Sequence, residues 1–183
     1  MNDIRKAQLR DIREKDLMLI LNWRNREAIR KVMYNGNTIS IEEHLQWFKR
    51  LEKDDASISK IFSYNQVDYG VLNIKKINRI NNNCEWGFYI GEQNTLRGLG
   101  TILGFTALNY IFNELSIRKL SAEVLSINEQ SISFHEKMGF VKEGVLRKHI
   151  KKDKDYIDIS LYSLFKEEWE NYSINIIRKI EGR

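Results

Sequence analysis

Residues 95–101, Thr-Leu-Arg-Gly-Leu-Gly-Thr, have the composition of an anion-binding turn. Gly98 and Gly100 let the backbone turn tightly with its N–H groups pointing outward. The apolar segment 102–115 predicts a helix, whose first N–H groups and dipole add positive potential. A strand-like run, 84–90, comes just before. Strand, glycine turn and helix together predict a cradle for a pyrophosphate, although a plain strand-to-helix turn also uses glycines.

Two familiar phosphate-binding motifs do not account for this turn. The dinucleotide fingerprint requires a third glycine where this chain has Leu103, and a preceding strand–helix unit where it has successive strand-like runs. A P-loop requires Gly-Lys followed by Ser or Thr, and the sequence contains no such run. Neither motif identifies the ligand of the turn.

The composition predicts a single domain, residues 1–183. Hydrophobic residues make up 42% of the chain, and there is no proline and no low-complexity linker. No apolar run approaches the roughly 20 residues of a membrane helix, and the N-terminus has no apolar leader. We therefore expect a cytoplasmic protein without a membrane partner. The single cysteine, Cys84, excludes an internal disulfide and is expected in the core.

The charge pattern limits the class of partner. The net charge of +5 agrees with an anionic small molecule or with no specific partner. The densest basic stretch, 147–154, is broken by Asp153 and carries no alternating aromatic residues. We therefore expect a solvated hairpin there and no nucleic-acid partner. No His, Cys, Asp and Glu residues have metal-ligand spacing, so no metal is expected.

The elements before the turn must hold it in place. Asp16 is expected to cap a helix whose apolar residues continue at helical spacing to Met33. Ser40 and Glu43 have the spacing of a capping box, which predicts a second helix to about Lys53. Apolar periodicity predicts strands at 7–12, 58–64, 69–77 and 83–90, the last three forming an antiparallel meander.

The segments beyond the turn complete a mixed sheet. The helix over 102–115 is apolar nearly all round, which indicates packing on a sheet. Asn128 and Gly139 are typical of the start and end of a short helix. Strands are expected at 118–125, 141–150 and 156–165, and a peripheral helical tail at 166–183, in which 180–183, Ile-Glu-Gly-Arg, match an engineered protease site. The fold class is α/β, with a mostly antiparallel central sheet flanked by helices.

A second motif follows the turn, since Asn128 precedes Phe134-His-Glu-Lys-Met-Gly-Phe140. With the glycine turn and this order of elements, it resembles the GCN5-related N-acetyltransferase (GNAT) superfamily. That family has Arg/Gln-x-x-Gly-x-Gly/Ala in the turn and Asn with Leu-Tyr-Glu-Lys-x-Gly-Phe in the later helix. The resemblance covers roughly residues 5–165. It implies a GNAT fold, with a V-shaped cofactor cleft between strands 84–90 and 118–125.

The resemblance implies acetyl-CoA as the co-substrate. Backbone N–H groups of the turn would hold its pyrophosphate. The edge of strand 84–90 would pair with the pantetheine amides like an added strand. Asn128 would contact the pantetheine arm or fix its loop. The cofactor-binding residues that it implies are Phe88, Tyr89, Ile90, Leu96, Arg97, Gly98, Leu99, Gly100, Thr101 and Asn128.

Two departures from the family concern chemistry. The residue that opens the turn is Thr95, which would leave a pyrophosphate contact to Arg97. The family tyrosine that protonates the leaving thiolate is His135 here, and histidine donates protons near neutral pH. The sequence is equally compatible with a histidine that packs at the edge of the core and has no acid role. A backbone N–H of strand 84–90 would hold the oxyanion. Glu85 is either the base, acting through water, or a plain strand carboxylate.

The N-terminal half resembles one branch of the superfamily, the N-acetyltransferases of pseudaminic acid biosynthesis. The motifs that carry this resemblance are Trp23-Arg-Asn25, Arg30, Met33-Tyr34 and Glu43-His-Leu-Gln-Trp-Phe48. The run Glu143-Gly-x-Leu-x5-Lys152-Asp-Lys-Asp-Tyr-Ile-Asp158 also looks like the C-terminal hairpin of that branch. That branch acetylates the 4-amino group of a UDP-linked 4-amino-4,6-dideoxy-hexosamine. Arginine and lysine side chains bind a diphosphate such as that of UDP through charge-assisted hydrogen bonds. The substrate-binding residues implied are Arg24, His44, Lys75, Lys76 and Tyr89, each also compatible with a plain surface or core position.

Three other functions remain open. The chain also resembles the polyamine and protein N-terminal branches of the superfamily, and a polyamine site would use acidic residues such as Glu42, Glu43 and Glu85. The histidine at position 135 leaves room for a catalytically silent acyl-CoA-binding module. A homodimer is expected because exposed strand edges pair readily.

Overall fold

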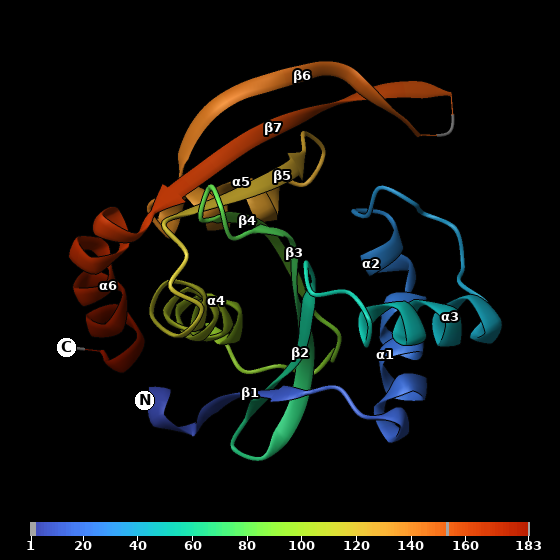
Figure 1. Ribbon diagram of the computed structural model, residues 1–183, viewed down its shortest axis with the longest axis horizontal. Helices are drawn as coiled ribbons and strands as arrows, with labels where there is room; N and C mark the ends of the chain where they lie inside the picture. Colours follow the sequence, from blue (N-terminus) through green and yellow to red (C-terminus); the bar gives the residue numbers. More distant parts are fainter. Residues whose placement is uncertain (1–2, 153, 183) are drawn as a thin grey trace.

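The computed structural model describes residues 3–152 and 154–182, which build one seven-stranded sheet (Figure 1). All neighbouring strands are antiparallel except β4 and β5. The mixed, mostly antiparallel sheet expected from the sequence is confirmed. In spatial order the strands are β1 (Ala7–Asp11), β2 (Ile58–Tyr64), β3 (Val67–Asn78), β4 (Asn83–Ile90), β5 (Lys119–Leu125), β7 (Asp155–Phe165) and β6 (Val141–Lys152).

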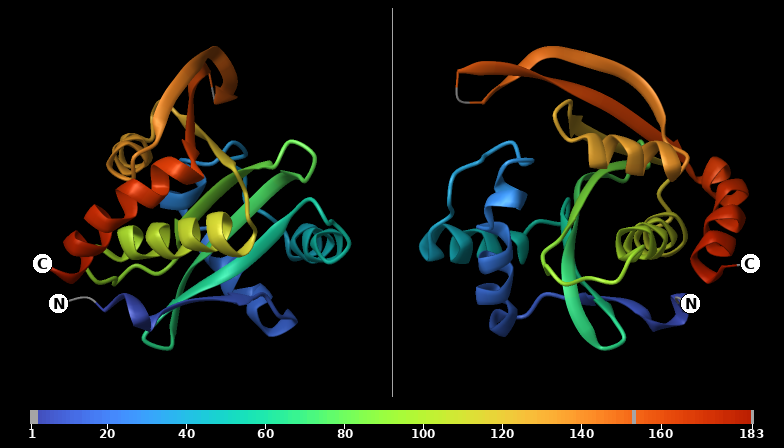
Figure 2. Two further views of the ribbon diagram at one scale, coloured as in Figure 1. Left: turned by 60° about the vertical axis from the view of Figure 1, so that its left-hand side comes forward. Right: turned by 180° about the vertical axis from the view of Figure 1, so that it is seen from behind.

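Helices cover both faces of the sheet (Figures 1 and 2). The larger hydrophobic cluster joins the sheet to α4, α5 and α6, and the smaller one joins Ile61 and Val71 to α1 and α2. None of the described helices is long and apolar enough to cross a membrane. The helices are α1 (Leu17–Arg24), α2 (Glu27–Arg30), α3 (Ile41–Leu51), α4 (Leu99–Asn109), α5 (Glu129–Lys137) and α6 (Lys166–Glu181), with short helical turns η1 (Ile4–Lys6), η2 (Glu14–Asp16) and η3 (Tyr110–Glu114).

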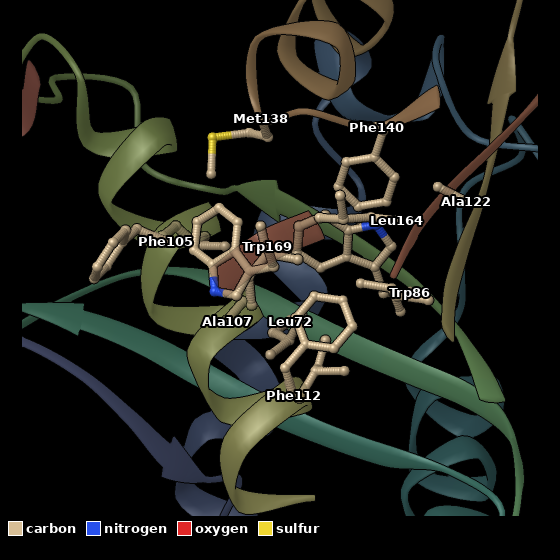
Figure 3. Close-up of a cluster of buried hydrophobic side chains, with 14 of the residues drawn as sticks. Leu72, Trp86, Phe105, Ala107, Phe112, Ala122, Met138, Phe140, Leu164 and Trp169 are labelled. Atoms are coloured by element: carbon tan, nitrogen blue, oxygen red, sulfur yellow. The ribbon is translucent and has the colours of Figure 1, made fainter. Parts of the chain in front are cut away.

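Aromatic rings fill much of the larger cluster (Figure 3). Trp86 of β4 stacks on Phe140 with ring centres 5.6 Å apart. Phe105 of α4 meets the ring of Trp169 at 5.6 Å and a steep angle. Burying one such side chain contributes about 1.5–3 kcal/mol. Trp86 of β4 and Phe105 of α4 thus belong to one buried cluster.

The prediction of one helix from Asp16 to Met33 is wrong, because the chain breaks between α1 and α2. The Asn25 side chain donates to the Ile39 carbonyl and accepts from the Ile39 N–H, both at 2.8 Å. These two bonds draw the loop 31–39 against α1. Asp16 does not cap α1 through its side chain, since its carboxylate lies 2.7 Å from the Arg10 guanidinium. Helix α1 therefore ends where the Asn25 side chain binds the loop 31–39.

The prediction of a helical tail is confirmed, but the tail is not peripheral. Trp169 of α6 is 1% exposed, and its Nε1 donates to Asn109 of α4 at 2.9 Å. Ile176 is fully buried. Ile180, the first residue of the suspected protease site, is also buried, whereas Arg183 lies outside the described residues. The helix packs beside α4 because its apolar residues repeat at helical spacing.

Candidate active site

Strands β4 and β5 run parallel but pair over a short stretch. The paired residues are Asn83 with Lys119, Cys84 with Leu120 and Glu85 with Ser121, and beyond them the two strands part. The segment 87–90 therefore presents a backbone edge that β5 does not cover. An extended ligand with amide groups can pair with such an edge as an added strand. The structure thus has the expected V, with Phe88, Tyr89 and Ile90 on its β4 side.

The glycine turn joins β4 to the first turn of α4. Gly98 is the N-cap residue, with a φ of 88° that L side chains rarely adopt. Gly100 has an ordinary backbone, and a Cβ placed there would meet no atom within 4 Å. At Gly104, by contrast, a Cβ would lie 2.5 Å from Phe134. Because no protein atom requires a glycine at position 100, its bare backbone fits the close approach of a diphosphate.

The other turn residues offer backbone rather than side-chain contacts. Leu99 is buried in the core and Leu96 is exposed, and neither side chain suits an anion. Thr101 accepts a hydrogen bond from Nζ of Lys137 on α5 at 3.2 Å. Lys137 therefore brings an ammonium group beside the turn. The sequence interpretation missed it, although it is the lysine of the Glu-Lys-x-Gly-Phe motif.

Helix α5 holds the two predicted residues of the second motif. Oδ1 of Asn128 accepts the N–H of Ser131 at 3.1 Å and so fixes the start of the helix, one of its two expected roles. Nδ1 of His135 lies 2.7 Å from the Ser131 carbonyl and therefore donates to it. The imidazole is 6% exposed. Its ring neighbours are Trp86, Phe134, Phe140 and Tyr162.

The protonation state of His135 bears on its expected role. Burial lowers the pKa of His135 to about 4, so the ring is neutral at pH 7. With the proton on Nδ1, Nε2 has none to donate to a leaving thiolate. The acid role stays a prediction, and the surroundings favour the alternative of a histidine packed at the edge of the core.

Alternation along β4 and β5 divides their side chains between two faces. Cys84 and Trp86 point into the larger core, and burial raises the pKa of the Cys84 thiol to about 12, which confirms an inert core cysteine. Tyr89 points the other way and packs with Trp23 of α1. We call this second side the acceptor face, and define it by Glu85, Gly87, Tyr89, Ser121 and Glu123.

Arg24, at the end of α1, is half-buried near Tyr89. Its Nη2 donates to the Asn35 carbonyl at 2.8 Å, while Nη1 is buried and has no hydrogen-bond partner within the described ranges. Burial lowers the pKa of Arg24, and the charge of Arg30 lowers it further. A buried guanidinium N–H without an acceptor can donate a strong, charge-assisted hydrogen bond to a bound anion.

The remaining predicted substrate residues lie in different places. Nζ of Lys76 lies 2.8 Å from Oε1 of Glu85, so this lysine reaches the acceptor face. Lys75 lies opposite Glu85 in the β3–β4 register and is exposed. His44 is buried between α3 and α1, where the Leu17 backbone is its partner. The structure therefore does not bring His44 together with Arg24.

Three further residues lie on the acceptor side and were not among the predicted substrate-binding residues. The hydroxyl of Tyr34, on the loop 31–39, donates to the carboxylate of Glu123 on β5. Arg30 holds the same loop through Nη1, which donates to the Gly36 carbonyl at 2.8 Å. Tyr34 and Arg30 belong to the motifs of the N-terminal half, whereas nothing in the sequence indicated the contact between Tyr34 and Glu123, because it joins residues 89 apart. Within the described part of the chain, no three His, Cys, Asp or Glu side chains form a metal site.

Comparison with known proteins agrees with this geometry. Residues 9–161 match the family model of the acetyltransferase (GNAT) domain. The chain is 26% identical to acetyltransferase PseH of Campylobacter jejuni over 86% of this chain and 93% of that protein. It is 33% identical to the SPbeta prophage-derived uncharacterized N-acetyltransferase YokL of Bacillus subtilis, over 68% and 71% of the two chains.

A solved structure shares the fold. Spermidine N-acetyltransferase from Vibrio cholerae, in complex with CoA and spermine, superposes with a TM-score of 0.85 at 23% identity, covering 91% of this chain and 99% of that one. Another structure of that enzyme is dodecameric. The family match extends from β1 into β7 and so includes the turn, the V and α5. The chain therefore belongs to the GNAT acetyltransferases and is an acetyl-CoA-dependent N-acetyltransferase.

Proposed function

We propose that this acetyltransferase modifies the 4-amino group of a UDP-linked 4-amino-4,6-dideoxy-hexosamine. The observation that carries the proposal is the buried Nη1 of the half-buried Arg24, which has no acceptor among the described residues. No carboxylate in the described part of the chain forms a salt bridge with it. A phosphate oxygen would supply that acceptor, and such a charge-assisted bond contributes about 1.5–3 kcal/mol.

Other cations on the acceptor side support an anionic acceptor. Arg30 lies near Arg24, and Lys76 reaches the acceptor face, with Lys75 beside it. The similarity to PseH over most of both chains agrees with the branch predicted from the sequence. The predicted uracil or phosphate contact of His44 has no support from its buried position between α3 and α1.

In this proposal the chain's own residues bind the cofactor, polarise the acetyl carbonyl and admit the acceptor. Acetyl-CoA supplies an acetyl group activated as a thioester. Backbone N–H groups of residues 96–101, with Lys137 beside them, would hold the pyrophosphate. The edge of β4 over 88–90 would pair with the pantetheine amides, and a backbone N–H near Phe88 or Tyr89 would polarise the acetyl carbonyl. The acceptor amine would approach from the acceptor face.

A polyamine acetyltransferase is the second candidate. The TM-score of 0.85 with the Vibrio cholerae spermidine enzyme favours it, as do the carboxylates of Glu85 and Glu123 on the acceptor face. A polyamine carries only positive charge, however, and would lie beside Arg24, Lys75 and Lys76. The position of these cations is why we rank the nucleotide sugar first.

An acceptor panel separates the two candidates. The release of CoA from acetyl-CoA is measured by thiol titration, with one acceptor added in each assay. The acceptors are UDP-4-amino-4,6-dideoxy-N-acetylaltrosamine, its gluco epimer, spermidine and a ribosomal N-terminal peptide. We expect kcat/KM for the better UDP-amino sugar to exceed that for spermidine by about 100-fold, the equivalent of one buried charge-assisted bond. Faster turnover of spermidine or of the peptide would refute the proposal. The preferred epimer would identify the sugar.

A further inference from the structure

The segment 91–98 joins the predicted pantetheine-binding edge of β4 to the glycine turn. It begins directly after Ile90, the last residue of β4, and it ends at Leu99, which is buried in the core. Residues 93–98, between these two ends, are exposed. An exposed stretch with few packed neighbours takes its position largely from its ends. The contacts that hold residues 91–92 therefore help to place both parts of the predicted cofactor site.

The indole of Trp23, on α1, holds the start of this segment. The side chain is 1% exposed and lies so close to Gly91 that a Cβ on that glycine would be 2.2 Å from the ring. Nε1 of Trp23 donates to Oε1 of Glu92 at 2.8 Å. Because the indole is buried, its N–H would lose this acceptor at a cost in free energy if Glu92 moved away. One side chain of α1 thus fixes two successive residues after β4.

Arg26, the N-cap residue of α2, holds the same two residues. Its guanidinium donates to the Gly91 carbonyl, and Nη2 lies 3.6 Å from Oε1 of Glu92. The N–H groups of Gly91 and Glu92 both donate to the Tyr69 carbonyl of β3, at 2.7 and 3.2 Å. Residues 91–92 are therefore held by β3 and by the junction of α1 and α2. We call Trp23, Arg26 and Glu92 the clamp.

The junction of α1 and α2 contributes to both sides of the V, with different residues for each. Arg24 and Asn25 bind the loop 31–39 of the acceptor side. The residues that flank them in sequence, Trp23 and Arg26, bind residues 91–92 instead. The clamp therefore belongs to the cofactor side, although it is built on helices that also shape the acceptor side.

We propose that Trp23, Arg26 and Glu92 are positioning residues for acetyl-CoA. They hold the junction between the β4 edge and the glycine turn, so that one backbone geometry serves pantetheine and pyrophosphate together. They act through the backbone of residues 91–92 and not by touching the cofactor. The proposal rests on CoA lying along β4 and the turn, and it does not depend on which amine is the acceptor.

The first test is the affinity of Glu92→Ala for CoA, measured by calorimetry. Loss of a negative charge by itself favours an anion such as CoA, so weaker binding in this variant reports a loss of position. We expect the Kd of CoA to rise about tenfold in Glu92→Ala but less than about threefold in Glu92→Gln, whose amide oxygen still accepts from the indole. An unchanged or lower Kd in Glu92→Ala, or an equal rise in both variants, would overturn the proposal.

Glu143→Ala is the matched control. Glu143 of β6 also combines a neutral donor, Oγ of Ser163 at 2.8 Å, with a cation, Nζ of Lys119 at 2.7 Å. Lys119 pairs with Asn83, the first residue of β4, whereas Glu92 follows the last. The Kd of CoA should stay within about twofold in this variant. A rise equal to that of Glu92→Ala would show that loss of either carboxylate weakens binding, which would contradict the clamp.

Trp23→Phe tests whether the indole acts through Glu92, since it keeps a ring and removes the N–H. We expect the Kd of CoA to rise about fivefold, and the double variant with Glu92→Ala to bind no more weakly than Glu92→Ala alone. Independent, multiplicative losses would overturn the link between the two residues. Urea unfolding of the same variants separates a structural role, because lower stability with an unchanged Kd would refute positioning.

Arg26→Lys tests the third member of the clamp. It keeps the positive charge but not the planar guanidinium that reaches both the Gly91 carbonyl and Glu92. We expect the Kd of CoA to rise about threefold. An unchanged Kd would contradict a positioning role for Arg26.

These outcomes are distinct from those of the acceptor panel, because CoA is the only ligand in the clamp test. Preferred turnover of spermidine would refute the nucleotide-sugar substrate and leave the clamp standing. An unchanged Kd of CoA in Glu92→Ala would refute the clamp and leave the nucleotide-sugar substrate standing.

Discussion

The two sides of the V are built on different principles. The predicted cofactor side is backbone from one continuous stretch, β4 through the first turn of α4, and at Gly100 the missing side chain leaves open space. The acceptor side uses side chains from α1, the loop 31–39, β3 and β5, brought together by long-range contacts such as Tyr34 to Glu123. The residues of the cofactor side can be predicted from a local sequence motif, whereas the arrangement of the acceptor side cannot.

This difference has a functional meaning. Every enzyme that uses acetyl-CoA must bind the same diphosphate and pantetheine, and backbone N–H groups do so irrespective of side chains. Acceptors differ in charge and shape, so they are distinguished by the side chains that face them. On this account, changes on the acceptor side alter the choice of substrate, whereas changes in the turn alter affinity for the cofactor.

The largest effect is expected from Arg24→Gln. Removing the guanidinium should raise the KM for the UDP-amino sugar about 100-fold and leave the KM for acetyl-CoA within about twofold, because the bond lost is to the acceptor. Arg50→Gln, which removes the same charge from the exposed face of α3, is the control and should change neither constant. A parallel rise in both KM values would show that the two sides are not separate.

The second effect concerns stability and His135, which is buried among aromatic residues. In the folded protein, burial lowers the pKa of His135 from its ordinary value of 6.5 to about 4. Below pH 6.5 His135 binds a proton in the unfolded chain but not in the folded chain. The free energy of unfolding therefore falls as the pH drops towards 4. Between pH 7.5 and 4.5, wild type should lose about 2 kcal/mol more unfolding free energy than His135→Phe. Urea unfolding at both pH values measures this, and identical losses would contradict a buried neutral ring.

The third effect isolates the turn. In Gly100→Ala the new methyl group has no clash within the protein, and alanine favours the helix by roughly 0.5–1 kcal/mol. We expect the unfolding free energy to stay constant or rise slightly while the Kd of acetyl-CoA rises about tenfold, close to 1.4 kcal/mol. The matched control is Gly144→Ala on β6, another glycine with open space at its Cβ position. Unchanged cofactor affinity, measured by calorimetry, would mean that the diphosphate does not approach residue 100.

The smallest effect is expected on turnover in His135→Phe. A neutral ring with its proton on Nδ1 has no proton at Nε2 for the thiolate, so kcat at pH 7 should change less than about threefold. A loss on the order of 100-fold, with acetyl-CoA affinity intact, would instead restore histidine as the acid that the sequence resemblance implies.

Much of the fold could be predicted from the sequence, since it depends on local patterns. The glycine turn, the capping box of Ser40 and Glu43, and the strand alternation all report on neighbours a few residues away. The predicted helix to Met33 failed because Asn25 bonds to Ile39, a contact that helical spacing does not contain. The tail was misjudged as peripheral because Trp169 finds its partner on α4.

The candidate site divides in the same way. The predicted cofactor residues lie in one strand–turn–helix segment, whereas the positions of the predicted acceptor residues depend on how separate helices and strands meet. Arg24 could be named from a motif, but its unsatisfied Nη1 is visible only in the structure. His44 could be named from the same half of the chain, yet it turns towards α1. The hydrogen bond between Tyr34 and Glu123 is likewise visible only in the structure.

The most direct test of an anion-binding acceptor side is calorimetric titration of UDP and of uridine in the presence of CoA. We predict that wild type binds UDP at least about 100-fold more tightly than uridine, a difference of roughly 2.7 kcal/mol, and that Arg24→Gln removes most of this difference. Equal affinity for the two ligands in wild type, or a difference that survives in Arg24→Gln, would contradict the account.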